Sequence, residues 1–261
     1  MKYNISDNNI EKVLTNIKRK LEENIEVINK LIKIDYQYCK IKTNIEMLKK
    51  VVDKFQGEKI DIQNEQKVLI KYNGNPCITL NFSILAILTK KTIYLDCNQN
   101  MLGINKFIVQ LVNRILEDFQ TDEIVYLTDG KISLENIDKI ICIDDINRYN
   151  LYLSENNEKA KFCALNYIDF YSNSEEFQEI TDLIYLYAEE NQIPIESYSE
   201  LDIDEAIKMM KNGLGKKVVI LTKNEQVKQD ILKNITDKEI YINQNPFEKE
   251  ISILSKEIFD I

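Results

Sequence analysis

The central part of the chain alternates short apolar runs with longer segments of helical periodicity. Apolar runs of strand length lie at residues 68–72, 92–96 and 122–130, and the segments between them, near residues 78–88 and 101–119, carry apolar side chains at helical spacing. Parallel strands cannot be joined by a tight turn, so each connection in this order must carry a helix across one face of the sheet. The pattern therefore predicts a βαβαβ unit with a parallel sheet.

The alternation continues towards the carboxyl terminus. It predicts a fourth strand, two further extended segments, and then a second, smaller β-α-β unit. The expected elements are strands at 139–144, 161–165, 167–171, 216–222 and 238–243, and helices at 175–190, 201–215 and 224–235. We therefore expect an α/β protein with a Rossmann-like parallel sheet and a small second unit.

Two amphipathic helices are expected before the first strand. The first begins after the capping residue Ser6 and keeps an apolar stripe from Ile10 to Ile32; the second, at residues 41–55, ends at Gly57. We expect these helices to form an antiparallel pair that packs on the sheet. A dimeric coiled coil is the alternative, because the first stripe is also compatible with heptad spacing.

This order of elements predicts three domains. Residues 1–60 hold the helical pair, residues 61–173 the Rossmann-like, nucleotide-binding-type domain, and residues 174–261 the smaller unit. The sequence contains neither an internal repeat nor a low-complexity linker between them.

The charge of the chain narrows the choice of partners. A net charge of −9 and a pI near 4.9 argue against binding to nucleic acid through its phosphate backbone, which needs clustered Lys and Arg. The pairs Lys90-Lys91 and Lys216-Lys217 flank expected strands and are expected to be solvated. There is no charged-then-apolar leader and no apolar run long enough to span a bilayer, so we expect a cytoplasmic protein with no membrane contact.

The residue types available for catalysis are restricted. The chain contains no histidine, and its five cysteines, at positions 39, 77, 97, 142 and 163, are scattered without a C-x-x-C motif. Ser-His-Asp and Cys-His catalysis and His-ligated metals are therefore excluded, and structural zinc is not expected. Any catalysis would have to use Cys, Lys, Tyr, Asp or Glu.

Four segments resemble, in the same order along the chain, parts of one enzyme family. They are the Asn-Pro-Cys-Ile-Thr turn at 75–79 with the strand and helix at 92–116, the strands within 137–173, the helix beginning at Leu201 within 193–212, and the strand-helix-strand at 216–247 that ends in Ile242-Asn243. These segments resemble the aldehyde dehydrogenase superfamily, and within it most of all glutamate-5-semialdehyde dehydrogenase, also called gamma-glutamyl phosphate reductase.

The resemblance implies a Rossmann-like domain that binds NAD(P) and a second domain whose cysteine thiolate attacks a carbonyl or acyl carbon. In this chain the place of that thiol falls within residues 171–200, which contain no cysteine. Residues 174–261 would then be a shortened remnant of the catalytic and oligomerisation domain. We therefore expect no catalytic residue of the family kind.

The cofactor side also departs from the family. The second strand ends in Asp96-Cys97-Asn98, residues 144–147 replace a glycine turn by a segment with two carboxylates, and no G-x-G-x-x-G motif occurs. The residues that could still contact a cofactor are Asn75, Pro76, Asp96 and Asn98. NADP is disfavoured because Asp96 would repel its 2′-phosphate, whereas NAD remains possible because an aspartate there can accept hydrogen bonds from ribose. Of these possibilities, our leading expectation is that the chain binds no cofactor.

Other candidate residues have two interpretations each. Cys163 could act as a substitute nucleophile, but its apolar neighbours favour a buried and inert thiol. Asp96, Asp144 and Asp145 could offer oxygen ligands to a divalent cation, but aspartates at strand ends are commonly turn formers. We expect no metal site.

These observations lead to a functional hypothesis and two alternatives. The leading hypothesis is a catalytically degenerate, aldehyde-dehydrogenase-like protein that acts as a binding or assembly subunit, as a homo-oligomer or with a full-length relative, through a tail at residues 239–261. The first alternative is an NAD-dependent semialdehyde or acyl-phosphate reductase with a non-standard active site. The second is a small-ligand sensor that has kept only the crevice.

Overall fold

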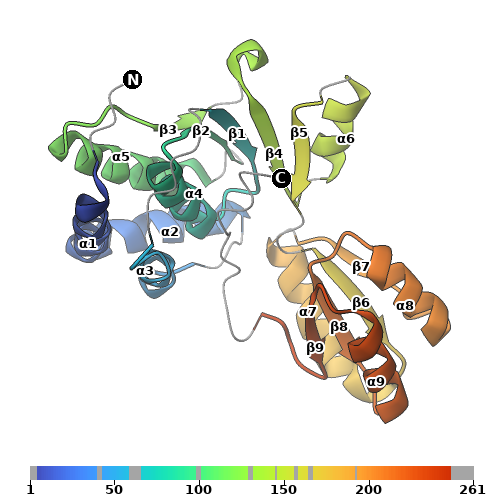
Figure 1. The fold of residues 1–261 in the computed structure, drawn as a ribbon. Helices are drawn as coiled ribbons and strands as arrows, with labels where there is room; N and C mark the ends of the chain where they lie inside the picture. Colours follow the sequence, from blue (N-terminus) through green and yellow to red (C-terminus); the bar gives the residue numbers. More distant parts are fainter. Residues whose placement is uncertain are drawn as a thin grey trace. The chain divides into compact units, whose positions relative to one another are not determined.

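A computed structural model describes residues 5–39, 43–58, 66–97, 101–128, 132–144, 146–155, 158–163, 167–191 and 193–247 (Figure 1). The chain divides after Cys163 into two compact units, and each is described by itself. None of the described helices is long and apolar enough to cross a membrane.

The first unit is built on a five-stranded parallel sheet. Its strands are β1 (Lys67–Lys71), β2 (Thr92–Asp96), β3 (Val125–Thr128), β4 (Lys139–Ile143) and β5 (Ala160–Cys163). Their order in the sheet is β3-β2-β1-β4-β5, and in the register Leu69 lies between Tyr94 and Ile140. This order is that of a Rossmann-type sheet, so the predicted α/β fold class is confirmed.

Two crossover helices cover one face of this sheet. They are α4 (Pro76–Thr89), which joins β1 to β2, and α5 (Leu102–Asp118), which joins β2 to β3. Every residue of α4 is buried, because α3 and α5 pack against it in addition to the sheet. The amino-terminal helices thus form a further layer outside α4 and α5 (Figure 1).

The amino-terminal segment contains three helices where two were predicted. These are α1 (Asp7–Glu23), α2 (Ile25–Cys39) and α3 (Ile45–Asp53). The first predicted helix breaks at Asn24, whose side-chain amide donates a hydrogen bond of 2.8 Å to the carbonyl of Lys20. Asparagine side chains compete in this way with the backbone bonds of a helix.

The other face of the sheet carries less helix. The described part of the connection from β3 to β4, residues 132–138, contains a short 3₁₀ turn, η2 (Leu134–Asn136), and β4 is followed by α6 (Ile146–Ser154). Tyr152 of α6 is buried in a cluster with Leu69, Ile140, Cys142 and Ala160. Helix α6 was not predicted from the sequence.

The second unit has a four-stranded parallel sheet of its own. Its strands are β6 (Ile168–Ser172), β7 (Ile195–Ser197), β8 (Lys217–Leu221) and β9 (Glu239–Ile242), in the order β7-β6-β8-β9. The sequence analysis assigned the β6 segment to a domain ending at residue 173. In the structure β6 pairs with β7 and β8, so it belongs to the second unit.

Helices cover both faces of the second sheet. A 3₁₀ turn, η3 (Glu175–Phe177), leads into α7 (Gln178–Asn191), and α8 (Ile203–Asn212) and α9 (Glu225–Asn234) follow. Ile184 of α7 packs on Phe170 and Val219, whereas Met210 of α8 and Ile231 of α9 belong to a separate cluster. Of the predicted tail contact surface, residues 248–261 lie outside the described part of the chain.

Two expectations about lysines were wrong. Lys91 and Lys217 are buried, at 1% and 3% exposure, although both were expected to be solvated. Each stands at the amino end of an interior strand, β2 or β8, which has neighbours on both sides.

Candidate functional site

The strand order of the first unit identifies where a ligand would be expected. In a parallel sheet of this order, ligands bind beyond the carboxyl ends of the strands where the order reverses, which here lies between β1 and β4. The described residues at that edge are the turn at 72–75 after β1, Cys97 after β2 and Asp144 after β4. The side chains at this edge decide whether the crevice is open.

The turn after β1 is occupied by a side chain of the protein itself. Gly74 has a φ of +97°, and a Cβ atom built on it would lie 2.7 Å from the Cβ of Met101. Met101 is buried and directly precedes α5. Glycine permits close approach to the backbone at such a turn, and here the approaching group is Met101.

A buried hydrogen-bond network lies at the same edge. The amide of Asn105 donates bonds of 2.7 Å to the carbonyls of Gly74 and Met101, and its oxygen accepts a bond of 2.5 Å from the hydroxyl of Thr79. Because that hydroxyl has only one proton, it accepts the 2.6 Å bond from the hydroxyl of Tyr72. The network ties the turn to the first turns of α4 and α5.

The amino ends of both crossover helices are capped from within the chain. The side-chain oxygen of Asn75 accepts a bond of 2.9 Å from the amide of Cys77 at the start of α4, where Pro76 is the first helical residue. A carboxylate oxygen of Asp35, in α2, accepts a bond of 2.9 Å from the amide of Ile104 at the start of α5. Helix amino ends are common phosphate sites, and these two are already satisfied.

The environment of Asp35 affects its protonation. Burial raises the pKa of its carboxyl, and hydrogen bonds from the amides of Ile104 and Gly103 act in the opposite direction. A Cβ atom on Gly103 would lie 2.9 Å from a carboxylate oxygen of Asp35. The carboxyl is therefore packed tightly against the helix end.

Asp96, predicted as a cofactor contact, forms an ion pair with Lys71 of the neighbouring strand. Both side chains are nearly buried, at 11% and 8% exposure. A ribose hydroxyl would have to compete with the ammonium group for this carboxylate. Of the other predicted contacts, Asn75 and Pro76 begin α4 as described, and Asn98 lies outside the described residues.

The cysteines near this edge are poor nucleophiles. Cys77 and Cys97 are buried, and burial raises the pKa of each thiol to about 11. Since the thiolate is the reactive species, neither is activated near neutral pH. Cys142 and Cys163 are also buried; the position of Cys163 fits the interpretation of an inert strand thiol.

No metal site is found among the described residues. They contain no group of three or more His, Cys, Asp or Glu side chains that could hold an ion. Asp144 has a φ of +56°, and its amide donates a bond of 2.9 Å to the carbonyl of Cys163. It is thus part of the turn after β4, while Asp145 lies outside the described residues.

The carboxyl edge of the second sheet is also linked by side chains. The oxygen of Asn243 accepts a bond of 2.8 Å from the amide of Thr222, and its own amide donates a bond of 3.0 Å to the Thr222 carbonyl. The amide of Ser172 donates a bond of 2.9 Å to the hydroxyl of Ser199. Asn243, part of the motif that suggested the family, therefore joins β8 to β9.

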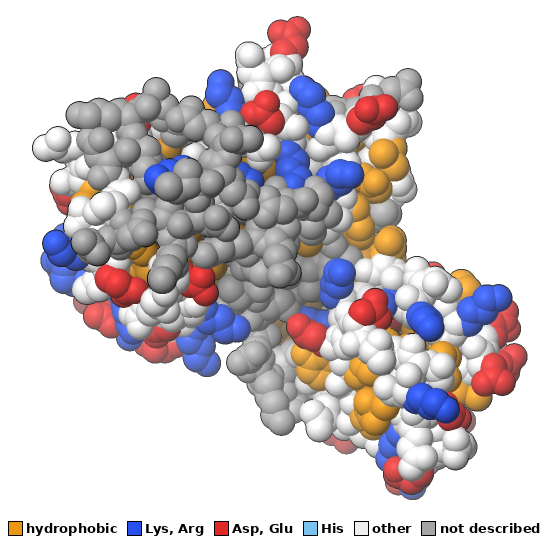
Figure 2. All heavy atoms as spheres, in the orientation of Figure 1, with side chains coloured by type: hydrophobic (Ala, Val, Ile, Leu, Met, Phe, Trp, Pro, Cys, Tyr) orange, Lys and Arg blue, Asp and Glu red, His pale blue; other side chains and the backbone are white. Residues whose placement is uncertain are grey.

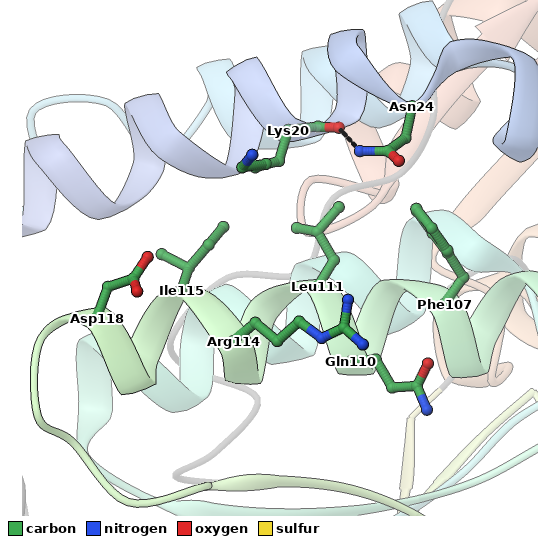
Figure 3. A pocket seen from close by; sticks show the side chains of 8 residues that line it. All are labelled: Lys20, Asn24, Phe107, Gln110, Leu111, Arg114, Ile115 and Asp118. Atoms are coloured by element: carbon green, nitrogen blue, oxygen red, sulfur yellow. Dashed lines mark hydrogen bonds between the residues drawn. The ribbon is translucent and has the colours of Figure 1, made fainter.

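A pocket of about 290 Å³ lies between α1 and α5 (Figure 3). Phe107, Leu111 and Ile115 point from α5 towards α1, and Lys20 and Asn24 lie opposite them. Charges of both signs line it, since Lys20 and Arg114 are basic and Asp118 is acidic. The full lining is Lys20, Asn24, Phe107, Gln110, Leu111, Arg114, Ile115 and Asp118. The pocket lies outside α5, away from the strand ends.

The surface charge agrees with the composition. On the face drawn in Figure 2, acidic and basic side chains of the described residues are interspersed. The described part of that face therefore shows no continuous basic surface of the kind that binds a phosphate backbone.

Comparison of the chain with known proteins is informative only at the level of structure. No protein-family model and no curated protein matches the chain. Many solved structures do match, with aldehyde dehydrogenases among them. The chain has the aldehyde dehydrogenase fold.

Three solved structures illustrate this likeness. Gamma-glutamyl phosphate reductase from Thermotoga maritima is 15% identical with a TM-score of 0.56, covering 93% of this chain and 84% of its own. Glyceraldehyde-3-phosphate dehydrogenase from Methanocaldococcus jannaschii, complexed with NADP, is 9% identical with a TM-score of 0.61, covering 95% and 83%. A mutant propionaldehyde dehydrogenase from Clostridium phytofermentans is 12% identical with a TM-score of 0.56, covering 97% and 89%.

The likeness confirms the predicted resemblance for the fold. The sequence analysis missed the residues that fill the strand-end edge: Asp35, Lys71, Met101 and Asn105. Lys71 carried a signal, because it is a charged residue within the apolar run at 68–72. Asp35, Met101 and Asn105 carried none.

Proposed function

We propose that this chain is a catalytically degenerate protein of aldehyde-dehydrogenase fold that acts as a binding or assembly subunit. The observation that carries the proposal is the filled edge of the first sheet, where Met101 packs against Gly74 and the Asn105 network closes the space. A nucleotide needs backbone amides and open space at this edge. Among the described residues, Asn75 and Asp35 accept bonds from amides at the starts of α4 and α5, and Met101 packs on the turn at Gly74.

The chemistry of the available side chains supports the same proposal. Cys77 and Cys97 have raised thiol pKa values of about 11, and the chain has no histidine to act as a base near neutral pH. Residues 171–200, where the resemblance would place the nucleophile, contain no cysteine. Neither residues 171–200 nor the two buried cysteines therefore supply a thiolate for covalent catalysis of the family kind.

The alternative is an NAD-dependent reductase of semialdehydes or acyl phosphates with a non-standard site. The fold favours it, since one structure of similar fold was solved with NADP bound. In this chain the cofactor would have to displace Met101 or separate Asp96 from Lys71. The two functions therefore differ in whether a nicotinamide nucleotide binds the unmodified chain.

Titration calorimetry of the full chain with NADH and with NADPH tests the proposal. We expect no saturable heat up to about 1 mM, the upper end of common substrate affinities, and no oxidation of either nucleotide when aldehydes or acyl phosphates are added. Asp96→Ala is the matched variant. Saturable NADH binding that this variant abolishes, together with turnover, would establish the alternative.

A further inference from the structure

Helix α7 is apolar on two opposite sides. Ile184 is buried against the second sheet and Ala188 is also buried, whereas Leu183 and Leu186 are 49% and 54% exposed. Tyr185 is 40% exposed although its ring contacts Phe170. A surface helix normally has one apolar stripe and a polar outer side, so the outer side of α7 has the composition of a contact surface.

Acidic side chains flank this surface on α7 itself. Asp182 lies four residues before Leu186 and Glu189 lies three residues after it, so both acids flank that leucine on the helix surface. Both acids are exposed. Between Ser172 and Ile207 the chain has eleven acidic residues and no Lys or Arg: Glu175, Glu176, Glu179, Asp182, Glu189, Glu190, Glu196, Glu200, Asp202, Asp204 and Glu205.

We propose that the outer side of α7 binds a basic amphipathic helix of a partner protein. Leu183 and Leu186 would meet the partner's apolar stripe, and its flanking Lys and Arg would meet Asp182 and Glu189. Two copies joined through this same surface would place acids against acids, which disfavours a second copy as the occupant. This inference names a partner class for the binding role proposed above and rests on it.

A labelled helical peptide tests the inference on the full chain. The peptide carries Leu at positions i, i+3, i+4 and i+7 and Lys at the flanking positions, and its scrambled form has the same composition. We expect fluorescence anisotropy to show binding of the patterned peptide only, weakened by salt because exposed charges are screened. The double variant Leu183→Ser/Leu186→Ser should weaken binding at least about tenfold.

Leu232→Ser provides the matched control. Leu232 lies on α9 and is 52% exposed, so this variant removes one exposed leucine from another helix and should leave peptide binding unchanged. Circular dichroism checks that all variants are folded. Equal binding by the two peptides, equal loss in both variants or no binding would overturn the inference, as would a dimer of the unmodified chain that the double variant dissociates.

The two proposals fail separately. The peptide measurement contains no nucleotide. If the peptide does not bind, the proposed partner class is wrong, whereas the proposed function is still tested separately by calorimetry with NADH. Turnover of NADH would remove the proposed function, whatever the peptide does.

Discussion

Asp169 and Lys238 form an ion pair inside the second unit. The side chain of Asp169 is fully buried, that of Lys238 is 5% exposed, and the carboxylate and ammonium are 2.7 Å apart. The ammonium also donates to the carbonyls of Met210 and Gly213. The presence of such a pair is weak evidence that it stabilises the fold. Removing one partner is nevertheless destabilising, because it leaves the other charge buried without a partner.

Replacing Lys238 by Met should lower the free energy of unfolding by about 3–5 kcal/mol at neutral pH. Burial raises the pKa of Asp169, with Lys238 acting to lower it, so the variant should raise that pKa further. The loss should be smallest below the unfolded aspartate pKa of about 3.9 and should grow as the pH rises through the folded value. Urea unfolding across this range measures it.

Lys233→Met is the control for this prediction. Lys233 is exposed on α9, and its loss should change the free energy of unfolding by no more than about 0.5 kcal/mol. A Lys238 variant as stable as this control at neutral pH would contradict the account of a stranded carboxylate.

Buried charged residues could be suspected from the sequence, but their ion-pair partners could not be identified from it. Asp169 and Lys71 each interrupt an apolar run, which signals a buried charge with a partner. Their partners, Lys238 and Asp96, lie far along the chain, 69 and 25 residues away. Only the strand order brings each pair together.

At the scale of elements, the turn between β1 and α4 connects the sheet to its crossover helices. Gly74→Ala should lower the free energy of unfolding by about 1–3 kcal/mol, because alanine is strained at a φ of +97° and its Cβ would meet Met101. Chemical denaturation measures the loss. The double variant with Met101→Gly, which removes the Cβ that the new methyl group would meet, should lose less than the sum of the two single losses.

Gly57→Ala separates the two causes. Gly57 also has a positive φ, of +82°, but a Cβ atom there would have nothing within 4 Å. Its loss should therefore reflect backbone strain alone and be smaller than that of Gly74→Ala. Equal losses, with no coupling to Met101, would show that Met101 does not fill the turn.

Elements were predictable where their hydrophobic period was unambiguous. The runs that became β1, β2, β4 and β8 are short, apolar and rich in β-branched residues. The break at Asn24 was not predictable, since the apolar stripe continues across it and a side-chain bond ends the helix. Likewise, α6 is short and has a weak apolar stripe, and Tyr152 is buried only because β4 and β5 lie beneath it.

At the scale of the whole molecule, each unit has its own sheet and core. The second unit packs α7 on one face of its sheet and α8 and α9 on the other. This arrangement encloses two apolar clusters without residues of the first unit. A unit of this kind has the anatomy of an independent domain.

Residues 164–252, which form the second unit, should therefore fold when expressed alone. We expect a helical circular dichroism spectrum and a single cooperative thermal transition. A matched fragment carrying Lys238→Met should melt at a lower temperature. A fragment without a cooperative transition would show that this core depends on the rest of the chain.

The molecule as a whole was more predictable in fold than in the state of its site. The alternating pattern and the resemblance both indicated an aldehyde dehydrogenase fold, and the solved structures agree. The packing at this edge depends on Met101 and Asn105 at the start of α5 and on Asp35 of α2, which come together only in the folded chain. Hydrophobic periodicity contains no information about such a meeting.

The carboxylate that caps α5 comes from α2, more than sixty residues earlier in the chain. A shortened chain starting after α2 would leave the first amides of α5 bare at the carboxyl edge of the sheet. Such a truncation would create an attraction for anions at this helix end, where Asp35 accepts a bond in the intact chain. The amino-terminal helices are therefore no detachable extension, and a nucleotide-binding signal measured on a trimmed fragment would say nothing about the native chain.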